Sequence, residues 1–264
     1  TRLPKDYVFL NYLRCHDDIG WGLDYEWLKQ FGIAEAPHKK YLNDYFQGKT
    51  EGSVSRGELY NEDPVTGDAR FCATTASMCG VESAGFEQDQ EKMACAIRKD
   101  LMLHAYMFTQ SGIPMLYSGD EIGQVNDYTY REDPDKAPDS RYIHRGKFCW
   151  DLTERIKDGS SVQGRIFAGL EELEKIRRTE AVFGADAEVY TKDYNDNSIL
   201  WIVRRAGDEE LHAVFNFSDE GRTIWMPEKA QYTNLVTGVT QETETVELSG
   251  WDFVWMHGGS PGSD

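Results

Sequence analysis

The chain has 264 residues, of which 40% are hydrophobic and 28% are charged, so it can form one large globular domain or two small ones. Acidic residues outnumber basic ones by 46 to 28, and the resulting net charge of −18 opposes binding to nucleic acid or to an anionic membrane. Basic runs such as His38-Lys39-Lys40 are short, and no segment is apolar enough to span a bilayer. We therefore expect a protein that binds neither nucleic acid nor membranes.

The 5 cysteines are odd in number and include no Cys-x-x-Cys pair. This pattern argues against a disulfide framework and against a zinc site. We expect reduced thiols, a cytoplasmic location, and no metal ion or other cofactor.

The first predicted element is a strand at Tyr7–Leu13. Its side chains are aromatic or branched on both faces, which is typical of a parallel strand that is covered on each side. It leads directly into His16, Asp17 and Asp18. A His-Asp pair rarely makes a complete active site and few residues precede it, so the motif predicts the back half of an enzyme.

Residues 20–85 mix aromatic residues with Gly, Asp and Asn, and a turn signal occurs at Asn61–Gly67. We predict a long ordered insertion that contains short helices at Tyr25–Phe31 and His38–Phe46. Loops of this length are usually functional.

A helix between Gln90 and Gln110 is predicted by apolar positions at spacings of three and four, namely Met93, Ile97, Leu101, His104 and Phe108. The helix ends before Gly112. A short apolar strand follows at Ile113–Tyr117 and leads into Asp120 and Glu121. Strand, helix and strand together indicate a βαβ unit.

A second helix is predicted at Gln163–Arg178, and the periodicity then changes to that of strands. An antiparallel sandwich is predicted from the segments Glu188–Asp193, Ile199–Arg205, Leu211–Phe217, Thr223–Met226, Val246–Leu248 and Trp251–Met256. We expect domains at 1–180 and 181–257, and a disordered tail at 258–264.

Ligands of alternating β/α folds bind beyond the carboxyl ends of the strands, where both acidic clusters lie. A neutral ligand rich in hydroxyl groups is held by carboxylates, imidazoles and guanidinium groups, with aromatic faces nearby. The chain offers all of these, and sugar is the natural candidate. The candidate residues are His16, Asp17, Asp18, Arg70, Arg141, His144 and Arg145.

Structural roles are open for the same residues. His16 and Asp17 are equally consistent with a hydrogen-bonded pair that anchors a loop. For Asp120 and Glu121 we favour a structural role, in which the carboxylates accept bonds from the next loop. Arg141 and Arg145 could each instead form an ordinary surface ion pair, which contributes under about 1 kcal/mol to stability.

Four segments together resemble the α-amylase superfamily of glycoside hydrolases, family 13, and within it the amylosucrases. They are Phe9-Leu-Asn-Tyr-Leu-Arg-Cys-His-Asp-Asp-Ile-Gly-Trp21, Tyr60-Asn61 with Thr66-Gly-Asp-Ala-Arg70, Gly112-Ile-Pro-Met-Leu-Tyr-Ser-Gly-Asp-Glu-Ile-Gly123, and Asp139-Ser-Arg-Tyr-Ile-His-Arg145. Asp18, the Gly-Asp-x-Arg segment and the Asp-Ser-Arg run point to the narrower group. The resemblance extends over nearly the whole chain.

The resemblance implies a fold of class α/β plus all-β. Tyr7–Leu13 and Ile113–Tyr117 would be the seventh and eighth strands of a (β/α)₈ barrel. Residues 20–85 would be a subdomain inserted after the seventh strand, and the antiparallel β-sandwich would follow the barrel.

The resemblance also implies roles for five residues. His16 and Asp17 would bind hydroxyl groups of the glucosyl ring, and Asp17 would stabilise the oxocarbenium-like transition state. Asp18 and Arg70 would line the pocket where fructose leaves and the glucan acceptor enters. Arg141 would pair with an acidic residue of the missing N-terminal barrel half.

A retaining enzyme needs two carboxylates about 5–5.5 Å apart, as nucleophile and acid/base. In the family these groups come from the fourth and fifth strands, which this chain lacks. We therefore predict that the chain alone is inactive, and that its open sheet edges favour self-association. The parent would transfer glucosyl units from sucrose to an α-glucan or maltooligosaccharide, with sucrose hydrolysis as a side reaction.

Two alternatives remain open. One is a hydrolase or isomerase of the same superfamily. The other is a non-catalytic carbohydrate-binding or interaction fragment, in which Trp201, Trp225, Trp251 and Trp255 would contact glucan. The alternate spacing of these tryptophans in strands favours core packing instead.

Overall fold

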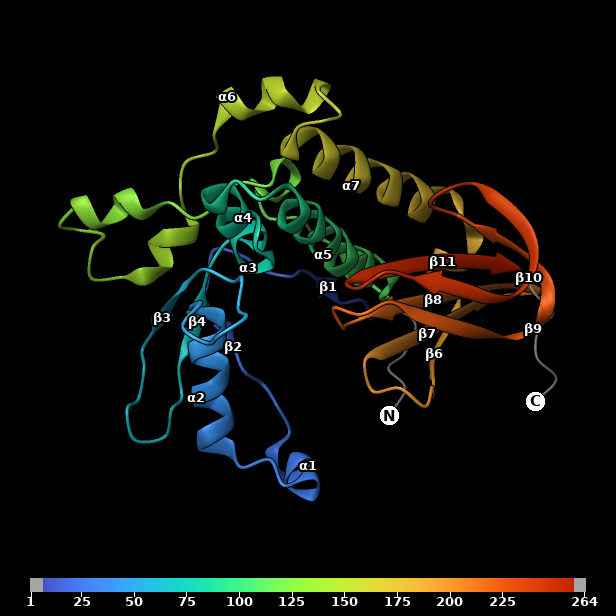
Figure 1. Cartoon of the computed structure of the whole chain (residues 1–264), viewed down its shortest axis with the longest axis horizontal. Helices are drawn as coiled ribbons and strands as arrows, with labels where there is room; N and C mark the ends of the chain where they lie inside the picture. The colour runs from blue at the N-terminus through green and yellow to red at the C-terminus, as the bar shows by residue number, and fades with distance from the viewer. Residues whose placement is uncertain (1–6, 259–264) are drawn as a thin grey trace. The chain divides into compact units, whose positions relative to one another are not determined.

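A computed structural model describes residues 7–258 of the chain. These residues divide into two compact units (Figure 1). Unit 1 contains residues 7–12, 101–115 and 168–258, and unit 2 contains residues 13–100 and 116–167. The division falls within α5 (Gln90–Thr109) and α7 (Val162–Thr179), so each of these helices contributes residues to both units.

The main feature of unit 1 is a six-stranded antiparallel sheet with the order β10-β9-β11-β8-β7-β6 (Figure 1). The strands are β6 (Glu188–Lys192), β7 (Ile199–Ala206), β8 (Glu209–Asn216), β9 (Arg222–Asn234), β10 (Val239–Leu248) and β11 (Asp252–Gly258). All six strands begin between residues 188 and 256, where the sequence predicts an antiparallel sandwich.

The hairpin of β9 and β10 is longer than the predicted segments Thr223–Met226 and Val246–Leu248. Pro227 and the charged residues after it interrupt the apolar alternation, so the outer part of the hairpin carries no strand signal. The turn between the strands contains Gly238, whose φ of +69° favours glycine.

The sheet curls on itself. Beyond the end of β6, Tyr194 Oη donates to Thr223 O (3.3 Å), and Asp196 pairs with Arg222 (2.8 Å), although β6 and β9 are not neighbours in the sheet. The curl encloses a core from five strands, formed by Trp201, Val203, Val214, Ile224, Met226, Tyr232, Val246, Leu248, Val254 and Met256. This arrangement is consistent with the predicted C-terminal sandwich.

Helical residues of unit 1 contact other side chains of the same sheet. Trp255 Nε1 donates to Thr109 Oγ1 of α5 (3.0 Å), and the rings of Tyr106 and Phe215 meet edge to face. The buried Arg204 guanidinium donates to Thr109 O (2.9 Å) and to Val182 O of η6 (Ala181–Phe183; 2.7 Å). Backbone carbonyls thus satisfy a charge that has been moved out of water.

Unit 1 also contains a two-stranded parallel sheet of β1 (Leu10–Asn11) and β5 (Ile113–Pro114). Both predicted strands therefore form, as parallel neighbours, but they are shorter than expected. The prediction that the first strand is covered on each face is wrong for this chain, since Phe9 and Leu10 are 61% and 57% exposed. Among the described residues no further strand flanks this pair.

Unit 2 contains residues 20–85, for which the sequence predicts an insertion with short helices. Its helices are α1 (Tyr25–Leu28), η1 (Lys29–Phe31) and α2 (Glu35–Phe46), and its antiparallel sheet has the order β2-β4-β3 with β2 (Ile19–Gly20), β3 (Glu58–Tyr60) and β4 (Arg70–Cys72). The rings of Trp21, Phe46 and Phe71 pack together, with centroids 4.9 Å and 5.2 Å apart. This aromatic packing holds α2 against the small sheet.

The remaining helices of unit 2 are short. They are α3 (Thr75–Cys79), α4 (Val81–Glu87), η2 (Asp120–Ile122), η3 (Tyr128–Glu132), η4 (Ser140–His144), α6 (Trp150–Thr153) and η5 (Glu154–Lys157). In the part of the chain that the structure describes, no helix is both long and apolar enough to cross a bilayer.

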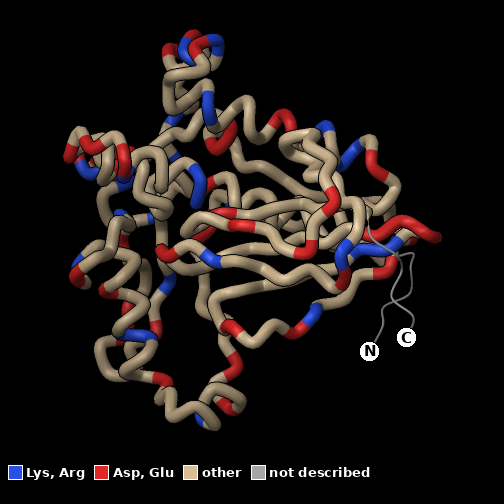
Figure 2. Tube along the Cα trace, turned by 45° about the vertical axis from the view of Figure 1, so that its right-hand side comes forward, with Lys and Arg blue, Asp and Glu red and all other residues tan. Residues whose placement is uncertain are grey.

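The remaining expectations concern the charged residues, the cysteines, the tail and the domain boundary. Lys and Arg residues do not form a long run along the described trace, where Asp and Glu residues lie between them (Figure 2). All five cysteines are free thiols. The predicted tail begins at Gly258, the last residue of β11, and residues 259–264 lie outside the described residues. The predicted domain boundary at residue 180 stays a prediction.

Candidate functional site

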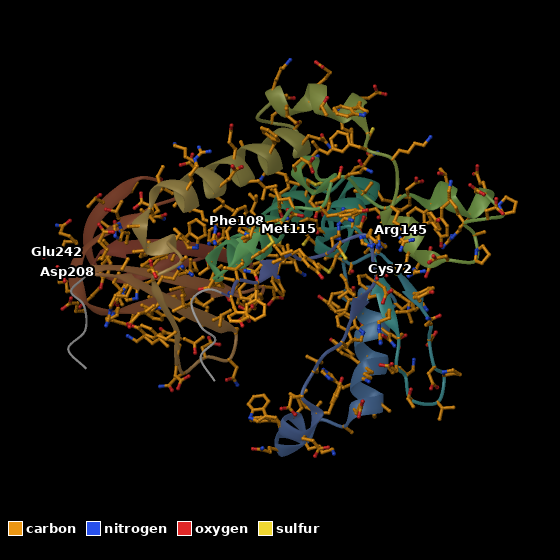
Figure 3. The ribbon with its side chains drawn as sticks, turned by 180° about the vertical axis from the view of Figure 1, so that it is seen from behind. Cys72, Phe108, Met115, Arg145, Asp208 and Glu242 are labelled. Atoms are coloured by element: carbon orange, nitrogen blue, oxygen red, sulfur yellow. The ribbon has the colours of Figure 1, made fainter. Side chains whose placement is uncertain are left out.

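The predicted site residues come from three segments of unit 2. Asp17 and Asp18 lie in the loop that follows β1 in the chain, Arg70 begins β4, and Arg141 lies on η4. β4 and η4 pack against each other, and Figure 3 shows Cys72 of β4 and Arg145 beside η4 in this region. Arg141 forms ion pairs with both aspartates, and Arg70 forms one with Asp18.

Arg141 is held on several sides. Its Nε and Nη2 each donate to Asp139 at 2.9 Å, which is the paired geometry that a planar guanidinium makes with a carboxylate. Its Nη1 donates to Asp17 Oδ1 at 3.1 Å, and the guanidinium carbon lies 4.4 Å from the centre of the Tyr60 ring. Within this chain, all three nitrogens of Arg141 therefore have carboxylate partners. Its pairing with an acidic residue of an N-terminal barrel half stays a prediction.

Asp17 is charged in this arrangement. The hydrogen bond from Arg141 is the main cause that lowers the pKa of Asp17 below its usual value, and the backbone N–H of Asp18 acts in the same direction. The side chain is 53% exposed, so one edge of the carboxylate faces solvent while Arg141 fixes the other. Asp17 is thus oriented and available to a ligand.

Asp18 connects Arg141 to Arg70. Asp18 Oδ1 lies 4.0 Å from Arg141 Nη1, and its Oδ2 lies 3.6 Å from Arg70 Nε. Arg70 is 43% exposed, and its Nη1 also lies 3.3 Å from Asp68 Oδ2. The two aspartates and two arginines predicted from the sequence therefore form one continuous cluster, which we call the Asp-Arg cluster.

His16 joins the Asp-Arg cluster through its backbone. Its carbonyl accepts a hydrogen bond from Arg145 Nε, and His144 Nε2 lies 3.4 Å from the same oxygen. His144 is buried, and burial, with Arg14 nearby, lowers its pKa to about 4. His144 is therefore neutral at pH 7 and, with Arg145, holds the loop that carries Asp17 and Asp18.

Two of the residues behind this loop were not predicted. Arg14 pairs with Asp120 at 2.8 Å, both side chains being at most 3% exposed, and its Nη1 donates to His144 O (3.3 Å). The signal was present in the sequence, because an arginine directly after an apolar strand requires an acidic partner when it is buried. Asp139 is the second of these residues. An aspartate directly before a short helix is a typical N-cap, and its side chain accepts from the backbone N–H of Arg141.

The acids after β5 have structural contacts. Glu121 Oε2 accepts a hydrogen bond from Gly119 N (2.7 Å), which is the kind of bond predicted for this pair. Asp120 instead forms the buried ion pair with Arg14. These two carboxylates support the loops beneath the Asp-Arg cluster.

The Asp-Arg cluster suits recognition rather than proton transfer. The pKa values of Asp17, Asp68 and Asp139 are all lowered, for Asp68 mainly by Lys39 and for Asp139 mainly by Arg141, so these groups accept hydrogen bonds at neutral pH. Fixed carboxylates and guanidinium groups can bind the hydroxyl groups of a neutral ligand. Among residues 7–258, no three His, Cys, Asp or Glu side chains converge as metal ligands would.

Comparison with known proteins gives distant similarities. No family model matches the chain. Glucosylglycerate phosphorylase of Escherichia coli is 22% identical over 260 residues, which are 97% of this chain and 42% of that enzyme. The chain therefore spans less than half the length of this curated relative.

Among solved structures, a maltotriose complex of an AmyP variant has a TM-score of 0.53 with 13% identity, over 69% of this chain and 38% of AmyP. The trehalulose synthase MutB of Pseudomonas mesoacidophila has a TM-score of 0.48 with 16% identity, over 61% of this chain and 38% of MutB. The AmyP match shows a shared fold.

Proposed function

We propose that this chain is the C-terminal part of an amylosucrase-type glucosyltransferase, which transfers glucosyl units from sucrose to an α-glucan and hydrolyses sucrose as a side reaction. The comparisons point to the C-terminal part of glycoside hydrolase family 13 enzymes. The observation that carries the finer proposal is the Asp-Arg cluster, because its members are the residues through which the sequence resembles amylosucrases.

In this proposal, His16 and Asp17 bind hydroxyl groups of the glucosyl ring. Arg141 fixes the Asp17 carboxylate, and a fixed negative charge stabilises the positive charge that develops on the ring in an oxocarbenium-like transition state. Asp18 and Arg70 line the neighbouring position, where fructose leaves and the glucan enters. The nucleophile and the acid/base belong to the part of the enzyme that this chain lacks.

The E. coli relative is a phosphorylase, so inorganic phosphate is the competing acceptor. The charges of the Asp-Arg cluster and of the ionic side chains beside it favour a neutral acceptor. Arg70, Arg141 and Arg145 each lie within 4.0 Å of a carboxylate. The four carboxylates of Asp17, Asp18, Asp68 and Asp139 outnumber these three arginines. A phosphate anion would therefore be repelled by an acidic group beside every guanidinium.

The test is product analysis with the complete enzyme, incubated with sucrose alone, with added maltooligosaccharide and with added phosphate. We expect fructose release together with longer glucan chains, and glucose as the side product. Glucose 1-phosphate as the main product would replace the proposal by phosphorolysis. An isomerised disaccharide, or glucose with no glucan at any acceptor concentration, would replace it by isomerisation or hydrolysis.

Two variants connect the activity to the Asp-Arg cluster. Arg141→Ala and Arg70→Ala in the complete enzyme should each reduce sucrose turnover, while Arg155→Ala on η5 should not. Unchanged turnover in both cluster variants would refute the assignment. Calorimetric titration of the 264-residue chain with maltooligosaccharides tests the alternative of a binding fragment, which predicts clear affinity without any partner.

A further inference from the structure

Arg70 lies across the edge of the small sheet in unit 2. It pairs with Gly20 of β2, and a Cβ atom at residue 20 would come within 3.3 Å of Arg70 Nε. The Nε faces Asp18 and the Nη1 faces Asp68, at 3.6 Å and 3.3 Å. Among the described residues, Nη2 has no hydrogen-bond acceptor. Two carboxylates thus fix the plane of the guanidinium and leave one nitrogen for a ligand.

Asp68 is itself held from α2. Lys39 Nζ lies 2.9 Å from Asp68 Oδ1 and 2.8 Å from Glu35 Oε1, and the Lys39 side chain is only 11% exposed. Lys39 lowers the pKa of Asp68, while Glu35 and Asp68 raise the pKa of Lys39. Both groups are therefore charged over the physiological pH range.

The loop that carries Asp68 is anchored to the same helix by its backbone. Asn43 Nδ2 donates to Gly67 O (2.9 Å), and Asn43 is 2% exposed. Gly67 has a φ of +71°, and a Cβ atom there would lie 3.2 Å from Ala36 O. This close approach sets the position of Asp68 relative to α2.

We propose that Lys39 and Asp68 are positioning residues, which hold the Arg70 guanidinium so that its Nη2 faces the incoming acceptor. The inference rests on the proposed function and extends it to α2 of the inserted subdomain. Without the Asp68 charge, Nη1 of Arg70 loses its carboxylate partner and keeps the long contact with Ala69 O (3.5 Å), so the guanidinium can turn onto Asp18. Arg70 and Asp18 would then no longer be available to bind the acceptor. The glucosyl-binding residues His16 and Asp17 would keep their contacts.

The test uses the complete enzyme and three variants, Asp68→Asn, Lys39→Met and Lys39→Arg, with Lys40→Met as the matched control. Lys40 is the next residue on α2 and is 73% exposed, and its one ion-pair partner among residues 7–258 is Asp44. A half-exposed ion pair contributes under about 1 kcal/mol, so Asp68→Asn and Lys39→Met should raise the acceptor KM by about three- to fivefold. The fall in kcat for sucrose hydrolysis should be smaller, and Lys39→Arg should restore the acceptor KM.

A double-mutant cycle separates positioning from a general loss of structure. In an Arg70→Ala background, Asp68→Asn should have no further effect on the acceptor KM, since the group it positions is absent. An equal effect in both backgrounds, or an effect of Lys40→Met as large as that of Lys39→Met, would overturn the inference.

Failure of the proposed function can be recognised separately, because the wild-type enzyme would then form no glucan from sucrose. In that case the 264-residue chain still decides the positioning claim. The Nε–H resonance of Arg70, assigned with Arg70→Lys, should shift in Asp68→Asn and Lys39→Met and stay in place in Lys40→Met. A resonance that stays unchanged in all three variants would contradict the claim.

Discussion

At the residue scale, the ion pair of Arg14 and Asp120 makes unit 2 sensitive to the loss of a single charge. Both side chains are almost fully buried, and the guanidinium also lies 4.5 Å from the centre of the Tyr117 ring. Removal of one partner leaves a buried charge uncompensated, so Asp120→Asn should lower the free energy of unfolding by about 3 kcal/mol. Urea unfolding measures the change. Asp133→Asn, which removes an exposed pair with Lys136, is the control and should change little.

His212 gives unit 1 a pH-dependent stability. Its Nδ1 accepts from Trp201 Nε1 (3.2 Å), which requires the neutral ring, and its Nε2 faces Glu210 at 3.2 Å. Burial, with Lys192 and Arg205 nearby, lowers the pKa of His212 from 6.5 to about 4. Between these two values the unfolded chain binds a proton that the folded chain does not, so stability falls as pH falls.

The corresponding measurement compares the wild type with His212→Gln at pH 7 and pH 5. The wild type should lose roughly 2 kcal/mol more unfolding free energy over this interval than the variant, because one pKa unit corresponds to about 1.4 kcal/mol. His144 acts in the same direction in both proteins and cancels. Titration of the His212 ring at or above pH 6.5 by NMR would contradict this assignment.

At the scale of elements, the approach of β3 to β4 depends on Gly57. A Cβ atom there would lie 2.3 Å from the Phe71 ring and 2.7 Å from Cys72 O, and neither can move freely because both residues are fully buried. Gly57→Ala should therefore destabilise the chain by about 1–3 kcal/mol in chemical unfolding. Gly22→Ala adds the same methyl group where nothing lies within 4 Å, and an equal loss there would argue against a steric cause.

The tryptophans of the sheet show how an element divides its side chains between core and surface. Trp201 and Trp255 are at most 1% exposed and belong to the core, as their alternate spacing favoured. Trp225 is 59% exposed. Of the four tryptophans considered for glucan binding, Trp225 therefore offers the largest free surface.

At the scale of the whole molecule, the exposed apolar side chains around β1 and β5 predict association. Tyr7, Phe9, Leu10 and Ile113 are each more than half exposed, and both strands keep an unpaired edge among the described residues. Sedimentation velocity of the isolated chain should show association that increases with concentration. Phe9→Lys should weaken it, whereas Phe86→Lys, at a residue of α4 that is 89% exposed, should not. A monomer at every concentration would refute this prediction.

The sequence by itself determined the local elements and singled out the candidate site residues. The spacing of apolar residues placed α5 and α7, and alternation placed β6, β7 and β8, because such periodicities follow from the geometry of one helix or strand. The motifs around Asp17, Arg70 and Arg141 singled out the residues that form the Asp-Arg cluster.

Tertiary structure decided how these residues are held. Arg141 pairs with Asp17, 124 positions away, and Arg14 pairs with Asp120 across 106 positions. The small sheet of unit 2 and the closure of β9 toward the end of β6 also depend on distant contacts. Periodicity reports only which face of an element is apolar, whereas the partner of a buried charge depends on which elements pack together, and that choice is made by the folded chain as a whole.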